Sequence, residues 1–157
     1  MTNQKLWGLC FAATALILPC AFSSAGCGGS SSHSQSVDQT QTTNNLKSLS
    51  LALDQYTEDC DEQMPNVTTP AGIKTALMPY THDSTVFVDP VNNVPFGWNA
   101  SLSGKVPATY PDASLIITFY DAQPPVANSI PVSLLNSQTQ LVTSAQFTQL
   151  KSTSGIP

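Results

Sequence analysis

An apolar segment near the first residue sets what the rest of the chain can fold into. Residues 6–22 are almost entirely apolar, and Lys5 gives the short stretch before them a positive charge. A run of small residues, 23–26, comes next and ends at Cys27. These regions stand in the order of an export signal that is removed from the mature protein. We therefore expect residues 1–26 to be a signal peptide, and the folded domain to lie in the remainder of the chain.

The same segment is short for a permanent membrane anchor. A helix needs about 20 apolar residues to cross the hydrocarbon core of a bilayer. Pro19 interrupts the run near its end, because proline removes a helix hydrogen bond. Three fates stay open: cleavage as a lipoprotein signal, cleavage as an ordinary secretory signal, and retention as an uncleaved anchor. The residues before Cys27 favour the first.

Residues 24–27, Ser-Ala-Gly-Cys, resemble the lipobox of bacterial lipoproteins. The resemblance implies that the Cys27 thiol takes a diacylglycerol group and that cleavage leaves Cys27 as the N-terminus. One position departs from the usual pattern, which has leucine or a similar residue where Ser24 stands. We predict an extracytoplasmic, membrane-anchored protein, in the periplasm or at the cell surface, with Cys27 as its lipid-modified residue.

Cysteine usage agrees with export and leaves no pair for an internal disulfide. Of the four cysteines, Cys10 and Cys20 would leave with the signal peptide and Cys27 would be acylated, so that only Cys60 stays in the domain. Cys60 lies within residues 58–62, Glu-Asp-Cys-Asp-Glu, whose carboxylates disfavour the thiolate that a nucleophile requires. We predict no catalytic residue and no enzyme activity.

Charge is sparse and mostly negative. The chain has five lysines, no arginine and ten acidic residues, for a net charge of −5. Binding of nucleic acid needs a basic surface that displaces counterions from phosphate, and attraction to an anionic membrane needs the same. We predict no nucleic-acid partner, and a membrane association that depends on the lipid.

A polar segment separates the leader from the domain. Residues 28–43 are Gly, Ser, Gln and Thr with almost nothing apolar, and such a segment cannot bury a core. We predict that 27–43 forms the lipidated cysteine and a flexible linker, and that 44–157 forms the folded domain.

The domain opens with an apolar stripe at helical spacing. The stripe repeats every three or four residues and consists of Leu46, Leu49, Leu53 and Tyr56. Leu51 and Ala52 are expected to widen it. The helix is expected to end at Tyr56, and residues 57–64 to form an acidic loop.

The next segments predict a second helix and a turn-rich region. Residues 71–80 form a short helix in this prediction, with Ile73 and Leu77 facing inward and Pro79 ending it. Residues 85–88 are a short β-prone run. From the turn-rich stretch 91–113, the aromatic side chains of Phe96 and Trp98 are expected to pack onto a sheet.

The last third of the chain predicts strands. Residues 115–120 are nearly all apolar or β-branched, as in a central strand. Residues 130–135 and 140–143 form two more strands around a turn at 136–137. Thr143 and Gln146 match a capping box for a final helix, whose Phe147 and Leu150 should face inward. The predicted fold class is α+β, an N-terminal helix packed on a small antiparallel sheet.

Several segments resemble one protein family, in order along the chain. Residues 45–53 (N-L-K-S-L-S-L-A-L) and 56–65 (Y-T-E-D-C-D-E-Q-M-P) are similar to the opening of the bacterial pseudopilin-like, prepilin-type processing-associated proteins. These are related to the pseudopilins of type II secretion. Residues 76–80 (A-L-M-P-Y), 86–90 (V-F-V-D-P) and 96–105 (F-G-W-N-A-S-L-S-G-K) continue the match. The resemblance implies a pilin-like head, a helix on an antiparallel sheet.

The departures from this family concern the leader and two places in the domain. One of these is the C-terminal turn, where Asn136-Ser137 stands in place of the family's usual Asp-Gly and no histidine lies near. The family's prepilin motif, which runs directly into a long apolar helix, has no counterpart here, and Asp89 stands where the family often has cysteine. The filament-forming stem is therefore not carried over. We predict a non-enzymatic, membrane-tethered lipoprotein whose pseudopilin-like head is a structural or interaction module of the cell envelope or of a secretion system. Its expected partners are the membrane, through Cys27, and envelope or secretion-system proteins.

The alternative is a small ligand- or calcium-binding lipoprotein. Asp59, Asp61 and Glu62 offer the carboxylate oxygens that Ca²⁺ prefers, although their spacing is not that of an EF-hand. A solvated loop after the helix is the other interpretation. His33, in the linker, and His82, after the second predicted helix, are isolated histidines with no cysteine partner, which does not favour a zinc site. We expect no resident metal and no cofactor.

Overall fold

The computed structural model describes residues 32–124 and 129–157, and of residues 32–38 only the backbone. The predicted signal peptide, 1–26, the lipidation site Cys27 and residues 28–31 of the predicted linker lie outside the described residues.

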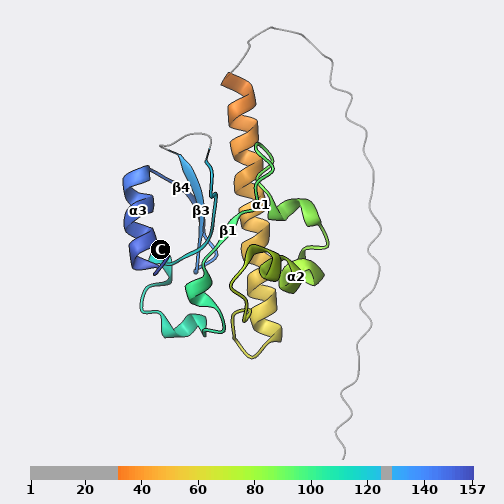
Figure 1. Cartoon of the computed structure of the whole chain (residues 1–157), viewed down its shortest axis with the longest axis vertical. Helices are drawn as coiled ribbons and strands as arrows, with labels where there is room; N and C mark the ends of the chain where they lie inside the picture. Colours follow the sequence, from red (N-terminus) through yellow and green to blue (C-terminus); the bar gives the residue numbers. More distant parts are fainter. Residues whose placement is uncertain (1–31, 125–128) are drawn as a thin grey trace, which may run out of the picture.

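Helices cover both faces of an antiparallel sheet (Figure 1). Helix α1 (Ser32–Asp59) runs along one face with α2 (Pro70–Thr81) beside it, and α3 (Ser144–Thr153) lies on the other face. The four strands lie in the order β1-β2-β3-β4. Their bounds are Gly97–Trp98, Ile117–Tyr120, Ile130–Leu134 and Thr139–Val142. The predicted α+β class, with an N-terminal helix on a small antiparallel sheet, is confirmed.

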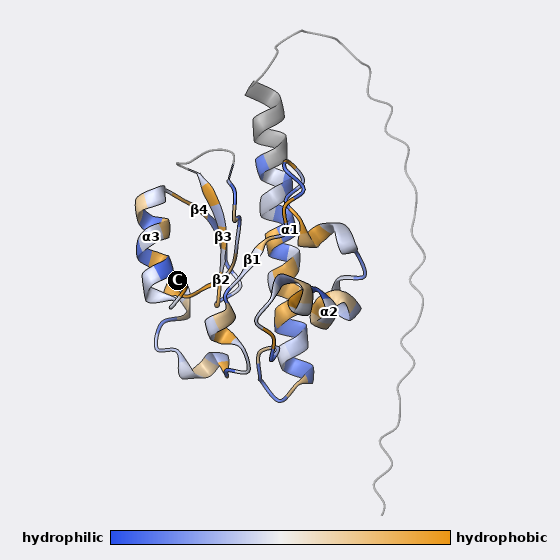
Figure 2. Cartoon of the chain, viewed as in Figure 1, coloured by the Kyte–Doolittle hydropathy of each residue, from blue (hydrophilic) through white to orange (hydrophobic). Residues whose placement is uncertain are grey.

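Helix α1 packs on the sheet through the predicted stripe. Leu46, Leu49 and Leu53 are at most 3% exposed, and Ala52 is buried with them. Leu51 is 59% exposed, so the prediction that it widens the stripe is wrong. Figure 2 shows hydrophobic residues on the part of α1 that lies beside the sheet. The helix also passes the predicted end at Tyr56 and continues to Asp59.

The predicted flexible linker is wrong for residues 32–43, because α1 already begins at Ser32. Hydrogen bonds attach this part of the helix to the rest of the domain, and the spacing of apolar residues does not predict such bonds. The Gln39 side-chain amide donates to Ser129 Oγ at 2.6 Å and to the Ser129 carbonyl at 3.2 Å. The Thr42 hydroxyl donates to Asp89 Oδ1 at 2.9 Å. Part-buried and buried hydrogen bonds thus attach this part of α1 to the domain, where apolar side chains attach it further along.

Helix α2, predicted for residues 71–80, begins one residue earlier and ends one residue later. The Thr69 hydroxyl accepts a hydrogen bond from the Gly72 amide, which is N-cap geometry. Ile73 and Leu77 are buried, as predicted. Pro79 lies inside the helix and does not end it. Pro79 and the residue four before it are exposed, so that water can replace the hydrogen bond that proline removes.

Residues 85–88, predicted as a β-prone run, do not form a strand. Ser84–Phe87 forms a 3₁₀ turn, η1, in which Asp83 Oδ1 accepts hydrogen bonds from the Thr85 amide at 2.8 Å and its hydroxyl at 2.7 Å. This local cap outweighs the β-propensity of the side chains. Only Val88 forms a bridge, to Pro95.

Strand β2 lies in the interior of the sheet between β1 and β3, as predicted, and β3 and β4 form a hairpin. Trp98 belongs to β1 itself and not to a loop packed on the sheet. Gly97 is opposite Tyr120, whose ring lies so close that a Cβ atom would meet it at 2.3 Å. The capping box of α3 is present, with Thr143 and Gln146 bonding reciprocally.

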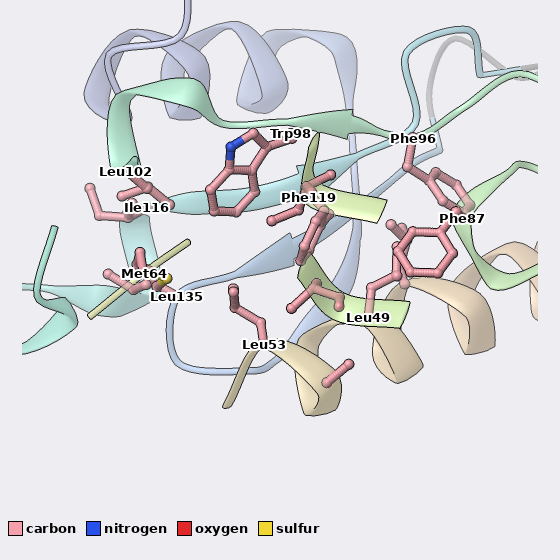
Figure 3. Packing of buried hydrophobic residues seen from close by; sticks show 14 residues of the cluster. Leu49, Leu53, Met64, Phe87, Phe96, Trp98, Leu102, Ile116, Phe119 and Leu135 are labelled. Carbon is pink, nitrogen blue, oxygen red and sulfur yellow. The ribbon is translucent and has the colours of Figure 1, made fainter. Parts of the chain in front are cut away.

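Two apolar clusters fill the two faces of the sheet. The cluster on the α1 side contains Phe119, whose ring lies between Trp98 and Leu49 (Figure 3). The cluster on the α3 side contains Ile117 and Val132, with Phe147 packed against it. The larger cluster, on the α1 side, borders an apolar cavity.

Candidate functional site

An apolar cavity of about 220 Å³ opens between α1, α2 and the sheet. Buried side chains from separate elements form its walls. They are Leu49 of α1, Ile73 of α2, Phe87 of η1, Phe96 and Phe119. The cavity therefore exists only in the folded domain.

A single charge stands at this cavity. Among the described residues that line it, Lys74 is the one with a charged side chain. The Lys74 ammonium lies 5.8 Å from the centroid of the Phe87 ring, within range of a cation–π contact. The exposed residues Pro70, Ala71 and Pro95 and the half-buried Val88 complete the lining. Such a site suits an apolar group that carries a negative charge at its outer end.

A second feature is a pair of buried carboxylates. Asp89 comes directly after Val88, which caps η1, and is 0% exposed, whereas Asp121 comes directly after β2 and is 2% exposed. Burial raises the pKa of Asp121 above its usual range. The hydrogen bond from the Gln123 amide acts in the opposite direction, and the nearby charge of Asp89 adds to the rise. The negative charge of Asp89 thus opposes ionisation of Asp121 in the same direction as burial does.

The acidic loop is not a preformed metal site. The structure does not bring Asp59, Asp61 and Glu62 together as ligands, and residues 32–124 and 129–157 contain no group of three or more His, Cys, Asp and Glu arranged to hold a metal. Asp61 and Glu62 adopt positive φ angles of 52° and 59° in the turn after α1. Asp59 accepts a hydrogen bond from the Tyr80 hydroxyl at 3.1 Å. The solvated-loop interpretation fits these contacts, and the calcium prediction at this loop is not supported.

Cys60 and His82 lie apart from the cavity lining. Cys60 is a half-buried free thiol beside Tyr56 at the end of α1. His82 is exposed and caps the C-terminus of α2 in a left-handed conformation, with φ of 54°. The side chain of His33 lies outside the described residues.

Within the described ranges, none of the helices combines the length and the apolar character needed to cross a membrane.

Comparison of the chain with protein-family models, with characterised proteins and with solved structures gives no match. The fold and the two features above therefore carry the functional argument.

Sequence reasoning did not find either feature. The cavity is assembled from residues between Leu49 and Phe119, each of which has the pattern of an ordinary core or loop residue. Asp89 and Asp121 are ordinary acids in sequence, and only the structure shows that both are buried. The presence of Asp89 where the resembling family often has cysteine is the one signal that pointed to it.

Proposed function

We propose that this chain is a non-enzymatic, extracytoplasmic lipoprotein, attached to a membrane through Cys27, whose pseudopilin-like head docks a protein of the cell envelope or of a secretion system. The observation that carries this proposal is the apolar cavity with Lys74 at its rim. The helix-on-sheet architecture supports the pseudopilin-like part of it.

The size of the cavity favours a side chain as its occupant. Sites for small molecules and cofactors usually measure about 300–1,000 Å³, and this cavity measures about 220 Å³. Protein interfaces concentrate their binding energy in one or a few large apolar side chains that fill such pockets. The ammonium of Lys74 adds a preference for an acidic residue next to that side chain. The expected partner therefore presents an aromatic or aliphatic anchor flanked by a carboxylate.

Position-specific crosslinking in the producing cells tests the docking part. A photoreactive residue at Ala71, on the exposed rim of the cavity, should crosslink an envelope protein, whereas one at the exposed Thr148 of α3 should not. Lys74→Glu should lower the yield at Ala71 at least several-fold, because it reverses the charge at the rim. Equal yields at the two positions, or a yield insensitive to the charge reversal, would contradict docking at the cavity.

Metabolic labelling with a fatty-acid probe tests the anchor. The full-length chain should incorporate the probe, and Cys27→Ser should abolish the label and release the protein from the membrane fraction. Cys60→Ser is the matched control and should keep both the label and the membrane fractionation. Labelling that survives in Cys27→Ser would remove the lipoprotein proposal.

The alternative, a ligand-binding lipoprotein, would use the same cavity for a small apolar anion. A rise of the melting temperature with a short-chain fatty acid, absent with the corresponding alcohol and lost in Lys74→Glu, would favour this alternative over a protein partner.

A further inference from the structure

The buried carboxylates of Asp89 and Asp121 lie in two neighbouring loops. Asp89 begins the loop that leads to the bridge at Pro95, and Asp121 is the first residue after β2. The side-chain amide of Asn92 donates to the carbonyl of Gln123 at 2.9 Å and joins the two loops. The fold thus fixes the positions of both acids.

One oxygen of each carboxylate is hydrogen-bonded within the protein. Asp89 Oδ1 accepts hydrogen bonds from the Thr42 hydroxyl at 2.9 Å and the Val91 amide at 3.2 Å. Asp121 Oδ1 accepts one from the Gln123 amide at 2.9 Å. These bonds orient the carboxylate planes and leave the second oxygen of each for another partner.

The second oxygens have none among the described residues. Asp89 Oδ2 and Asp121 Oδ2 each expose less than 1 Å² and accept no hydrogen bond. A buried carboxylate oxygen without a partner is strongly destabilising, and two in proximity also repel one another. Native folds rarely keep such groups without a compensating ion, water or proton.

We propose that Asp89 Oδ2 and Asp121 Oδ2 bind one divalent cation, with Ca²⁺ the ion whose ligand preference they fit. Ca²⁺ takes oxygen ligands, including carboxylates, backbone carbonyls and water, in flexible geometry. Two carboxylates match its charge. This site is separate from the acidic loop after α1 and independent of the cavity at Lys74.

A cation here would join three parts of the domain. Asp89 is bonded to Thr42 of α1, and Asp121 lies at the end of β2. Binding would therefore fasten the segment of α1 around Thr42 to the sheet. The expected consequence is a domain whose stability depends on the cation.

Thermal unfolding of the full-length chain in detergent tests the proposal. Protein freed of metal with a chelator should melt at a higher temperature, by about 5 °C or more, after addition of millimolar CaCl₂. Calorimetric titration with CaCl₂ should show about one site per chain. Asp121→Asn and Asp89→Asn, which keep the side-chain size, should lose both responses. Asp61→Asn, in the exposed acidic loop, should keep both.

The same measurements can contradict the proposed cation site. If neither CaCl₂ nor MgCl₂ moves the melting temperature of the wild-type chain and neither gives binding heat, the cation site does not exist. If the metal-free wild type instead becomes more stable as the pH falls, with no cation response, the two carboxyls share a proton and the proposal is wrong. The wild-type arm gives this answer even if a variant fails to fold.

Discussion

Replacing Phe119 by alanine should lower the free energy of unfolding by about 3–5 kcal/mol, as expected for loss of a large aromatic side chain from a packed core. Phe119 is 1% exposed and lies within β2. Its ring lies 5.3 Å from that of Trp98, centroid to centroid, in a tilted pair. It also packs against Leu49 of α1, so its removal loosens the contact between the helix and the sheet.

Urea unfolding measured by circular dichroism checks this effect. Leu141→Ala is the matched control, because Leu141 lies on the edge strand β4 and is 48% exposed. It should change the free energy of unfolding by less than about 0.5 kcal/mol. A loss below about 1 kcal/mol for Phe119→Ala would mean that α1 is not packed on the sheet in this way.

The second large effect is expected for Asn99→Leu, which should cost about 3 kcal/mol or more, since each buried group left without its partner costs about 1–3 kcal/mol. Asn99 is 1% exposed. Its side-chain amide donates to the carbonyls of Ile117 at 2.8 Å and Ser154 at 3.1 Å. Its oxygen accepts from the Ser101 amide at 3.1 Å and hydroxyl at 2.7 Å. One side chain thereby links the end of β1, strand β2 and the segment after α3.

Two further substitutions provide comparisons for the loss of stability in Asn99→Leu, measured in the same urea unfolding assay. Ser101→Ala removes the hydroxyl that donates to Asn99 Oδ1 and to the Ser154 carbonyl, and it should cost about 1 kcal/mol. Asn66→Leu, at an exposed position, should have an effect within about 0.5 kcal/mol. If Asn99→Leu were as mild as Asn66→Leu, the buried hydrogen-bond network would not contribute to folding.

Where apolar periodicity was strong, the sequence predicted the fold well. The stripe from Leu46 to Leu53 is buried in α1. The β-branched run around Ile117 is a strand inside the sheet. The capping box at Thr143 begins α3. In each case one local rule and the tertiary packing point to the same structure.

The errors arose where polar contacts or local caps decide the conformation. The helical residues 32–43 contain no apolar stripe, and Gln39 and Thr42 bond to residues 90 and 47 positions away, which no local pattern reveals. Asp83 turned a β-prone run into a 3₁₀ turn. Pro79 was tolerated because it lies on the exposed side of α2 near its end.

The candidate sites were beyond sequence reasoning for a related reason. The high local charge density indicated a possible Ca²⁺ site at the acidic residues around Asp61, but these residues are exposed. The two acids that the fold isolates from water, Asp89 and Asp121, are far apart in the chain. Burial depends on the packing of the whole domain, so only the three-dimensional arrangement distinguishes these two acids from the others.

The early start of α1 limits how far the head can travel. The helix has 28 residues, about 42 Å at 1.5 Å per residue. With the proposed acyl group on Cys27, the few residues between the lipid and Ser32 span at most about 18 Å. A flexible linker through residue 43 would allow a much larger distance between the lipid and the head. Because α1 is part of the head from Gln39 onward, only residues 28–31 and the first turns of the helix would separate the head from the lipid. The head would therefore reach only proteins next to it in the same membrane.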